Sequence, residues 1–171
     1  KLTGSHPVLL GPGVVTDFKN GVVLAATNPN AGIPVVEGIT VDDSRYSGIL
    51  VVSTATAIIN DVVVDDTGDA NNVGNGVACN GTCTVELSTI RDSYHDGIYC
   101  NNAPSCGSYS NIFINNNSQD IQVNSSSLTE YHSCPHDINA LNSSVVYVYE
   151  LSSCLSIDCL NDGTSTYIDA G

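Results

Sequence analysis

Three ionisable residues lie close together in the segment T-I-R-D-S-Y-H-D-G-I, residues 89–98: Asp92, His95 and Asp96. A carboxylic acid beside an imidazole has the groups needed for general acid–base catalysis. In this interpretation Asp92 or Asp96 is the acid and His95 assists it. The alternative is that these residues turn a corner that recurs along the chain.

The segment I-T-V-D-D-S-R-Y-S-G-I, residues 39–49, has the same frame without the histidine. In both segments an apolar run ends at an Asp, and a Gly followed by Ile comes five and six residues later. The alignment places Asp92 with Asp43 and Asp66, His95 with Tyr46, and Asp96 with Ser47. Asp and Asn favour sharp corners because their side chains bond the local backbone and tolerate left-handed φ. The corner interpretation therefore explains the acids without catalysis, and no catalytic residue is assigned beyond the candidates Asp43, Asp66, Asp92 and His95.

Two Asp pairs, Asp42-Asp43 and Asp65-Asp66, add further carboxylates to the same frame. If successive segments stack, two Asp lie near the roughly 5 Å carboxyl separation of retaining glycosidases. Such a stack could also chelate calcium. Arg45 and Arg91, the only arginines in the chain, are expected to form local ion pairs with these acids.

The stretch H-S-C-P-H-D contains His132, Cys134 and His136, whose ligand types suit zinc. No second ligand pair of the kind found in zinc modules accompanies it. In an oxidising compartment Cys134 is more readily half of a disulfide, so no metal site is assigned. No cofactor is expected, with calcium as the one candidate.

Seven Cys and four N-x-[ST] sequons, at Asn80, Asn116, Asn124 and Asn142, indicate an oxidising compartment and N-glycosylation. The expected location is extracellular or at the cell surface. With 4 Lys and Arg against 18 Asp and Glu, a net charge of -14 argues against nucleic-acid binding. No apolar run is long enough to span a bilayer, so membrane insertion is not expected.

The elements that must position these residues follow from a repeat. A polar residue ends each apolar run, and six such residues recur along the chain: Asp17, Asp43, Asp66, Asp92, Asn115 and Asp158. The steps between them are 26, 23, 26, 23 and 43 residues. The last step is about twice the others, so one coil with a less clear pattern is expected within it, near residues 137–142. A short strand is expected after each of the first five, at 22–24, 49–51, 77–79, 98–100 and 121–123. A third strand is expected at 57–59 and 85–87. Loops at 28–34 and after Asp66 interrupt the period.

This repeat resembles the right-handed parallel β-helix of the pectate-lyase-like superfamily. The predicted fold is all-β, a single domain over residues 1–171 with about seven coils of roughly 22–26 residues. We expect it to be a segment of a longer or polymerising chain. The resemblance does not extend to a catalytic site, because the strings N-T-D, G-H-G, R-I-K and D-P-H-E of its enzymatic members are absent.

The cysteines share the repeat, because Cys79 matches Cys100 and Cys83 matches Cys106. Local bridges would close C-N-G-T-C and C-N-N-A-P-S-C, whereas coil-to-coil bridges would join the matched pairs; the Gly and Pro loops favour the local scheme. Cys154 and Cys159 are also expected in disulfides. Of the three cysteines Cys134, Cys154 and Cys159, one must be unpaired or bonded outside the chain.

Two functions fit the sequence. The first is an extracellular structural glycoprotein, a β-helical rod or filament subunit whose partners are copies of itself, end to end, and glycans. The second is a fragment of a carbohydrate-active enzyme or a sugar-binding module. Tyr147 and Tyr149 alternate with valines, so both lie on one face and could stack on sugars or form an interface.

Overall fold

A computed structural model describes residues 8–25, 32–131, 138–141, 144–149 and 167–169. These residues form only strands, turns and irregular segments. Within them, no helix has the length and apolar character needed to cross a bilayer. The all-β prediction is confirmed.

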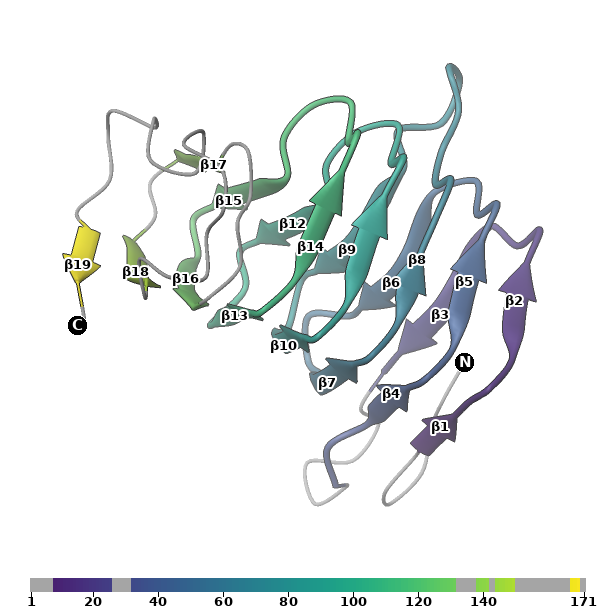
Figure 1. Ribbon diagram of the computed structural model, residues 1–171, viewed down its shortest axis with the longest axis horizontal. Helices are drawn as coiled ribbons and strands as arrows, with labels where there is room; N and C mark the ends of the chain where they lie inside the picture. The colour runs from purple at the N-terminus through teal and green to yellow at the C-terminus, as the bar shows by residue number, and fades with distance from the viewer. Residues whose placement is uncertain (1–7, 26–31, 132–137, 142–143, 150–166, 170–171) are drawn as a thin grey trace.

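The strands form three parallel sheets (Figure 1). Sheet 1 contains β1 (Val8–Leu10), β4 (Val35–Glu37), β7 (Thr56–Asn60), β10 (Thr82–Glu86), β13 (Cys106–Tyr109), β16 (Ser127–Tyr131), β18 (Ser144–Tyr149) and β19 (Tyr167–Asp169). Sheet 2 contains β2 (Val14–Thr16), β5 (Thr40–Asp42), β8 (Val63–Val64), β11 (Thr89–Arg91) and β14 (Ile112–Ile114). Sheet 3 contains β3 (Asn20–Leu24), β6 (Ser47–Val51), β9 (Asn75–Cys79), β12 (Ile98–Asn101), β15 (Ile121–Asn124) and β17 (Ile138–Leu141).

The chain passes through sheets 1, 2 and 3 in turn, so each passage is one coil of a parallel β-helix. The register in sheet 2 aligns residues at steps of 26, 23, 26 and 23: Val15, Val41, Val64, Ile90 and Phe113. These are the predicted steps. Within the described residues five coils contain a strand of every sheet, which is fewer than the seven coils predicted. After β15 the described strands belong to sheets 1 and 3 only, and the coil expected near residues 137–142 supplies β17.

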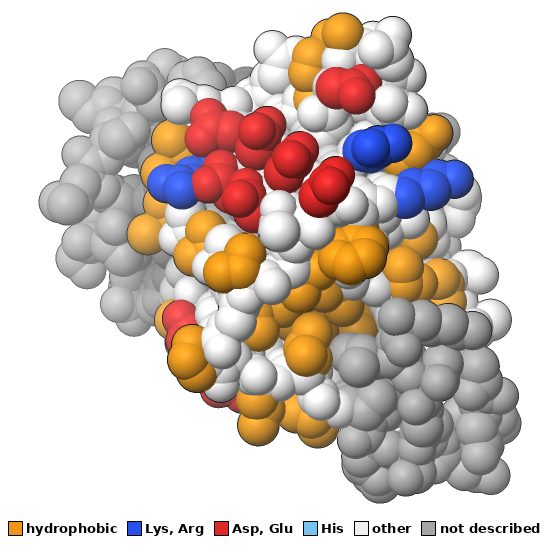
Figure 2. Space-filling model, turned by 90° about the vertical axis from the view of Figure 1, so that its right-hand side faces the viewer, with side chains coloured by type: hydrophobic (Ala, Val, Ile, Leu, Met, Phe, Trp, Pro, Cys, Tyr) orange, Lys and Arg blue, Asp and Glu red, His pale blue; other side chains and the backbone are white. Residues whose placement is uncertain are grey.

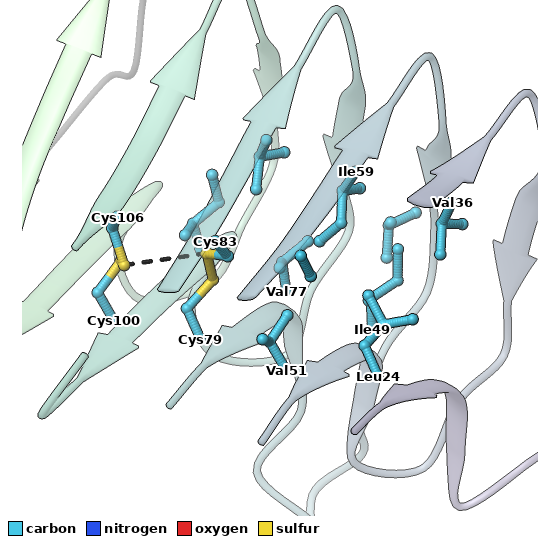
Figure 3. Close-up of a cluster of buried hydrophobic side chains, with 14 of the residues drawn as sticks. Leu24, Val36, Ile49, Val51, Ile59, Val77, Cys79, Cys83, Cys100 and Cys106 are labelled. Atoms are coloured by element: carbon cyan, nitrogen blue, oxygen red, sulfur yellow. Dashed lines mark hydrogen bonds between the residues drawn. A yellow bond between two sulfur atoms is a disulfide. The ribbon is translucent and has the colours of Figure 1, made fainter. Parts of the chain in front are cut away.

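The core consists of inward side chains from consecutive coils (Figure 3). Val41, Val64 and Ile90 of sheet 2 are fully buried, as are Val36 and Ile59 of sheet 1. Their neighbours along each strand point outward, which is the period-2 alternation of strands. Burial of each such side chain contributes about 1.5–3 kcal/mol before the entropy of ordering is subtracted. The core therefore holds neighbouring coils together along the axis.

Every coil turns at residues with left-handed backbone, even where they are not glycine. Gly38, Asp61, Leu87 and Ser110 link sheet 1 to sheet 2 with φ between 50° and 67°, and Asn102 and Ser125 link sheet 3 to sheet 1. The prediction that Leu87 ends a strand is wrong, because β10 ends at Glu86 and Leu87 is a corner with φ 51°. Its isobutyl group is then 64% exposed. Corner geometry overrides the apolar side chain at this position.

A glycine column, Gly21, Gly48, Gly76 and Gly97, occupies equivalent positions in sheet 3. A Cβ on Gly48 would lie 2.3 Å from Val64 Cγ1 and 2.8 Å from the carbonyl oxygen of Gly76. The other three glycines have the same kind of contacts. Sheet 3 can therefore approach the side chains of sheet 2 only where the Cβ is missing.

The substitution Gly48→Ala is expected to destabilise the fold by about 1–3 kcal/mol, because the added methyl overpacks a fixed corner. Gly13→Ala is the matched control, since a Cβ there has nothing within 4 Å. Urea unfolding of both variants measures the difference. Equal stability of the two variants would show that the corner relaxes and that the glycine column is not required.

Candidate functional site

The predicted corner aspartates form a column, meaning residues at equivalent positions in successive coils. All of them have left-handed φ values, between 46° and 61°: Asp17, Asp43, Asp66, Asp92 and Asn115. The amide Nδ2 of Asn115 donates to Asp92 Oδ1 at 3.3 Å. The corner interpretation of the Asp is confirmed. We call these five residues the acidic column, and Asp158 lies outside the described residues.

The acidic column and its neighbours form an acidic patch on one surface of the molecule (Figure 2). Arg91 forms an ion pair with Asp65, and Arg45 lies 4.0 Å from Asp17, as expected for local pairs. Partial burial and repulsion by Asp43, and further by Asp42, Asp65 and Asp92, raise the pKa of Asp66. Calcium at this surface remains a prediction, and Arg91 already supplies positive charge to one of the four proposed ligands.

His95 and Asp96 form a dyad at the next turn of the chain. His95 Nδ1 lies 2.7 Å from Asp96 Oδ2, and the carboxylate is completely buried while the imidazole is 43% exposed. Burial raises the pKa of Asp96, and His95 partly opposes that effect. The imidazole thus bonds Asp96 rather than Asp92. The geometry orients His95 through Asp96, whose carboxylate also accepts a hydrogen bond from the side chain of Ser118.

Asp96 also belongs to a hydrogen-bonded column that links coils in sheet 3. Its backbone N–H donates to Asn75 Oδ1 at 3.2 Å, and its own Oδ1 accepts from the backbone N–H of Gln119 at 3.3 Å. Two coils earlier, Asn20 Oδ1 accepts from the backbone N–H of Ser47 at 3.3 Å. The register aligns Ser47, Asn75 and Asp96, as the alignment of Asp96 with Ser47 predicts. Asp96 therefore has a structural role, in agreement with the corner interpretation, and the hydrogen bonds between coils add to it a contact that spacing alone does not indicate.

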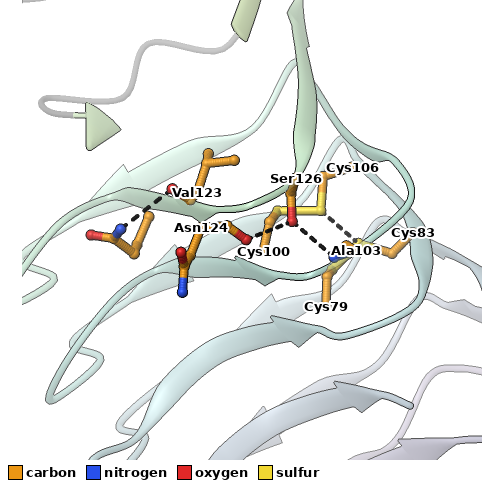
Figure 4. Close-up of a disulfide and its surroundings, with 9 residues drawn as sticks. Cys79, Cys83, Cys100, Ala103, Cys106, Val123, Asn124 and Ser126 are labelled. Carbon is orange, nitrogen blue, oxygen red and sulfur yellow. Dashed lines mark hydrogen bonds between the residues drawn. A yellow bond between two sulfur atoms is a disulfide. The ribbon is translucent and has the colours of Figure 1, made fainter. Parts of the chain in front are cut away.

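Four cysteines form two disulfides inside the coil, Cys79–Cys83 and Cys100–Cys106. The local scheme is confirmed. The sulfurs of Cys83 and Cys106 lie 3.9 Å apart (Figures 3 and 4), but neither carries a hydrogen to donate. The sulfurs of Cys79, Cys83 and Cys106 lie close enough together to bind one metal ion. A cysteine binds zinc as a free thiolate, however, and all three of these cysteines are in disulfides. These disulfides indicate an oxidising, extracellular-like environment.

The remaining predicted metal and disulfide residues lie outside the described residues: His132, Cys134, His136, Cys154 and Cys159. The sequon residue Asn142 lies outside them as well. Tyr147 and Tyr149 are in β18, where Tyr147 aligns with Glu130. Neither the metal prediction nor the sugar-stacking prediction is tested by these positions.

A groove of about 460 Å³ lies where sheet 3 turns into sheet 1. It is lined by Val52, Ser53, Asn80, Asn101, Asn102 and Pro104. Four of these residues lie within the two disulfide-closed loops. The walls combine amides and a hydroxyl with two apolar side chains, which is a surface suited to a polar, uncharged ligand. No sequence motif marks this groove, because its lining comes from three coils.

No family model, curated protein or solved structure matches the chain. The parallel β-helix is thus established by the strand topology, and membership of the pectate-lyase-like superfamily is not.

Replacing Asp66 with Asn removes one charge from the acidic surface and keeps a residue type that the column already uses at Asn115. The substitution is expected to raise the free energy of unfolding at about pH 7 by at most about 1 kcal/mol, because solvent screens these charges. Because the pKa of Asp66 is raised in the folded protein, its ionised carboxylate lowers the stability of the fold above that pKa. This loss of stability disappears as Asp66 is protonated. The gain should therefore vanish near pH 3, as measured by urea unfolding.

The matched variant for that measurement is Asp66→Ala, which also removes the charge. Ala does not tolerate left-handed φ as Asn does, so this variant should lose about 1 kcal/mol relative to Asp66→Asn. If Asp66→Asn destabilises the protein at neutral pH, the carboxylate has an attractive partner and the repulsion described above does not dominate.

Asp96→Asn keeps an oxygen to accept from Gln119 and removes a buried charge, so it should change stability little or raise it. Because burial raises the folded pKa of Asp96, the wild type loses stability as pH rises through that pKa, and the variant does not. The advantage of Asp96→Asn should grow as the pH rises above about 4, the ordinary pKa of an Asp carboxyl, until Asp96 is ionised in the folded protein. Chemical denaturation across this range measures it.

Asp96→Ala is the comparison, since it leaves the Gln119 N–H without an acceptor. We expect a loss of about 1–3 kcal/mol. Equal destabilisation by the Asn and Ala variants would mean that the charge on Asp96, and not the hydrogen-bonded column, stabilises the corner.

Proposed function

We propose that the protein is an extracellular structural glycoprotein, a β-helical rod that assembles end to end with copies of itself. The observation that carries this proposal is the incomplete covering of the first coil. Its inward residues Leu9 and Val15 are only partly buried. The equivalent residues of the next coil, Val36 and Val41, are fully buried by the coils on both sides.

The strand edges of the first coil pair with no other strand of the described residues. Among the described strands, β1, β2 and β3 are each the last of their sheet. Apolar side chains gather at this end of the molecule (Figure 2), where Val8, Leu10 and Val14 are 49%, 63% and 66% exposed. Edge strands with free N–H and C=O groups pair with further strands. A copy stacked in parallel register would satisfy these groups and cover the apolar residues.

The far end of sheet 2 supports the same mode of association. Phe113 of β14, the counterpart of Val15, is partly buried, and Ile112 is 58% exposed. Contact between the far end of one copy and the first coil of the next would be heterologous and would not close. Such contacts produce a fibre rather than a ring. The disulfides and sequons are consistent with an extracellular location for this fibre.

Purified full-length chain is expected to form fibres visible by negative-stain electron microscopy. The axial repeat should be about 24 Å if the five complete coils set it, or about 38 Å if the eight strands of sheet 1 do. Val8→Lys and Val14→Lys should reduce assembly, because lysine on an edge strand opposes pairing. Assembly is quantified by sedimentation of the same samples.

Val73→Lys is the control, since Val73 is 58% exposed but lies on the loop between β8 and β9. It should assemble like the wild type. A wild-type chain that stays monomeric at all concentrations tested would contradict the rod. Equal loss of assembly in all three variants would show that net charge, not the first coil, is responsible.

A carbohydrate-active fragment or sugar-binding module is the second candidate, favoured by the amide-lined groove and by the stacked carboxylates. In this proposal the chain belongs to the pectate-lyase-like superfamily. A polysaccharide panel tests it with the single variants Asp43→Asn, Asp66→Asn and Asp92→Asn. An activity that disappears with one of them would replace the structural function.

A further inference from the structure

The three sequon asparagines in the described part of the chain differ in what their side-chain nitrogen does. At Asn116, Nδ2 donates to the carbonyl oxygen of Ile90 at 3.3 Å and to Asp120 Oδ1 at 2.9 Å. Its Oδ1 accepts from the backbone N–H of Ser93 at 3.2 Å. Both amide hydrogens are therefore in use. A sugar on this nitrogen would remove one hydrogen bond and occupy the place of an acceptor.

At Asn124, the side-chain nitrogen donates one hydrogen bond. Its Nδ2 donates to Asn101 Oδ1 at 3.2 Å, between adjacent coils. One hydrogen of Nδ2 remains for substitution, so a glycan here is compatible with the fold only if this contact keeps the other hydrogen. Asn124 is intermediate between the other two sequons.

Asn80 is the third sequon asparagine, and its side chain makes no hydrogen bond to the described residues. Its backbone, in contrast, is held by hydrogen bonds. The backbone N–H of Asn80 donates to Val51 O at 2.9 Å, and that of Thr82 donates to Ala55 O at 2.9 Å. The Cys79–Cys83 disulfide closes the loop on both sides of the sequon. The backbone that carries the acceptor side chain is thus fixed, and its Nδ2 makes no hydrogen bond to the described residues.

The groove begins at this asparagine. Asn101 and Asn102 supply amides beside Asn80, Ser53 supplies a hydroxyl, and Pro104 supplies an apolar surface. Sugars present hydroxyl and acetamido groups together with apolar C–H faces, and this lining offers a partner for each. The Cys100–Cys106 disulfide fixes the wall that contains Asn101, Asn102 and Pro104. A glycan attached at Asn80 has the groove within reach without any loop movement.

We propose that Asn80 is an N-glycan acceptor and that the groove holds the first sugars of its own glycan. The donor is a polyprenyl-pyrophosphate oligosaccharide: a bond forms between Asn80 Nδ2 and the anomeric carbon, the anomeric C–O bond to pyrophosphate breaks, and Nδ2 releases a proton. This inference rests on the extracellular part of the proposed function. It does not depend on fibre assembly.

Occupancy is measured on the full chain secreted from eukaryotic cells, by glycopeptide mass spectrometry of the folded, soluble protein. We expect Asn80 to be occupied and Asn116 to be unmodified. Asn80→Gln should remove the mass of one glycan, whereas Asn116→Gln should not change the mass of the glycans. An unmodified Asn80, or a glycan on Asn116 in folded protein, overturns the assignment whether or not fibres form.

Seating in the groove is measured after trimming the Asn80 glycan to a single N-acetylglucosamine. The sugar should raise the thermal unfolding midpoint by about 2–4 °C relative to the same protein without it. In Ser53→Ala and Asn102→Gly this rise should fall by more than half. Glycine is chosen because Asn102 has φ 50°. A rise that is the same in the wild type and in both variants would place the sugar outside the groove.

Ser110→Gly is the matched control, since it changes a left-handed corner between sheets 1 and 2, away from the groove. It should keep the full sugar-dependent rise. The competing occupant is a free oligosaccharide, tested by calorimetric titration of Asn80→Gln protein with chitobiose. The absence of measurable heat supports the attached glycan, whereas saturable binding by this variant would make the groove a site for external sugars instead.

Discussion

The backbone hydrogen bonds between coils, which fix a spacing of about 4.8 Å along the axis, are the constraint on which the rest of the structure depends. Because every sheet is parallel and in register, each coil must turn at the same three places as the coil before it. The turns require left-handed backbone at equivalent residues, including the unfavourable Leu87. The register of the sheets thus overrides the conformational preference of an individual residue. It also places each corner side chain next to its counterpart one coil away.

The same stacking determines the electrostatics of the protein. Aspartate suits a left-handed corner, but repetition of the corner places carboxylates next to one another and raises the pKa of Asp66. Arg91 offsets part of this repulsion through Asp65, and Asn115 ends the acidic column with a neutral residue that donates to Asp92. The acidic surface is therefore a consequence of how the chain turns. Its presence alone does not indicate catalysis or a bound cation.

The sequence predicted the features that recur in phase. The spacing from Asp17 to Asn115 identified the corners, and the matched cysteines narrowed the disulfides to two schemes. Fewer complete coils are described than the seven predicted, because the described strands after β15 belong to sheets 1 and 3 and none belongs to sheet 2. The sequence analysis assigned Leu87 to a strand because hydrophobicity identifies inward residues but does not reveal backbone φ. The period of the repeat predicts which residues occupy equivalent positions in successive coils. It does not predict the backbone conformation that each residue adopts.

The candidate sites were harder to predict because they depend on contacts between coils rather than on motifs. Asn80, Asn116 and Asn124 have the same sequon, and only the neighbouring coil distinguishes them. Asn116 faces a carbonyl and a carboxylate that take both of its hydrogens, Asn124 faces Asn101, and Asn80 faces the open groove. Likewise Asp96 accepts from Gln119 in the next coil, so it is buried for a structural reason. In a solenoid, the chemistry available to a side chain is set by the residue one coil away, about 23 positions along the sequence.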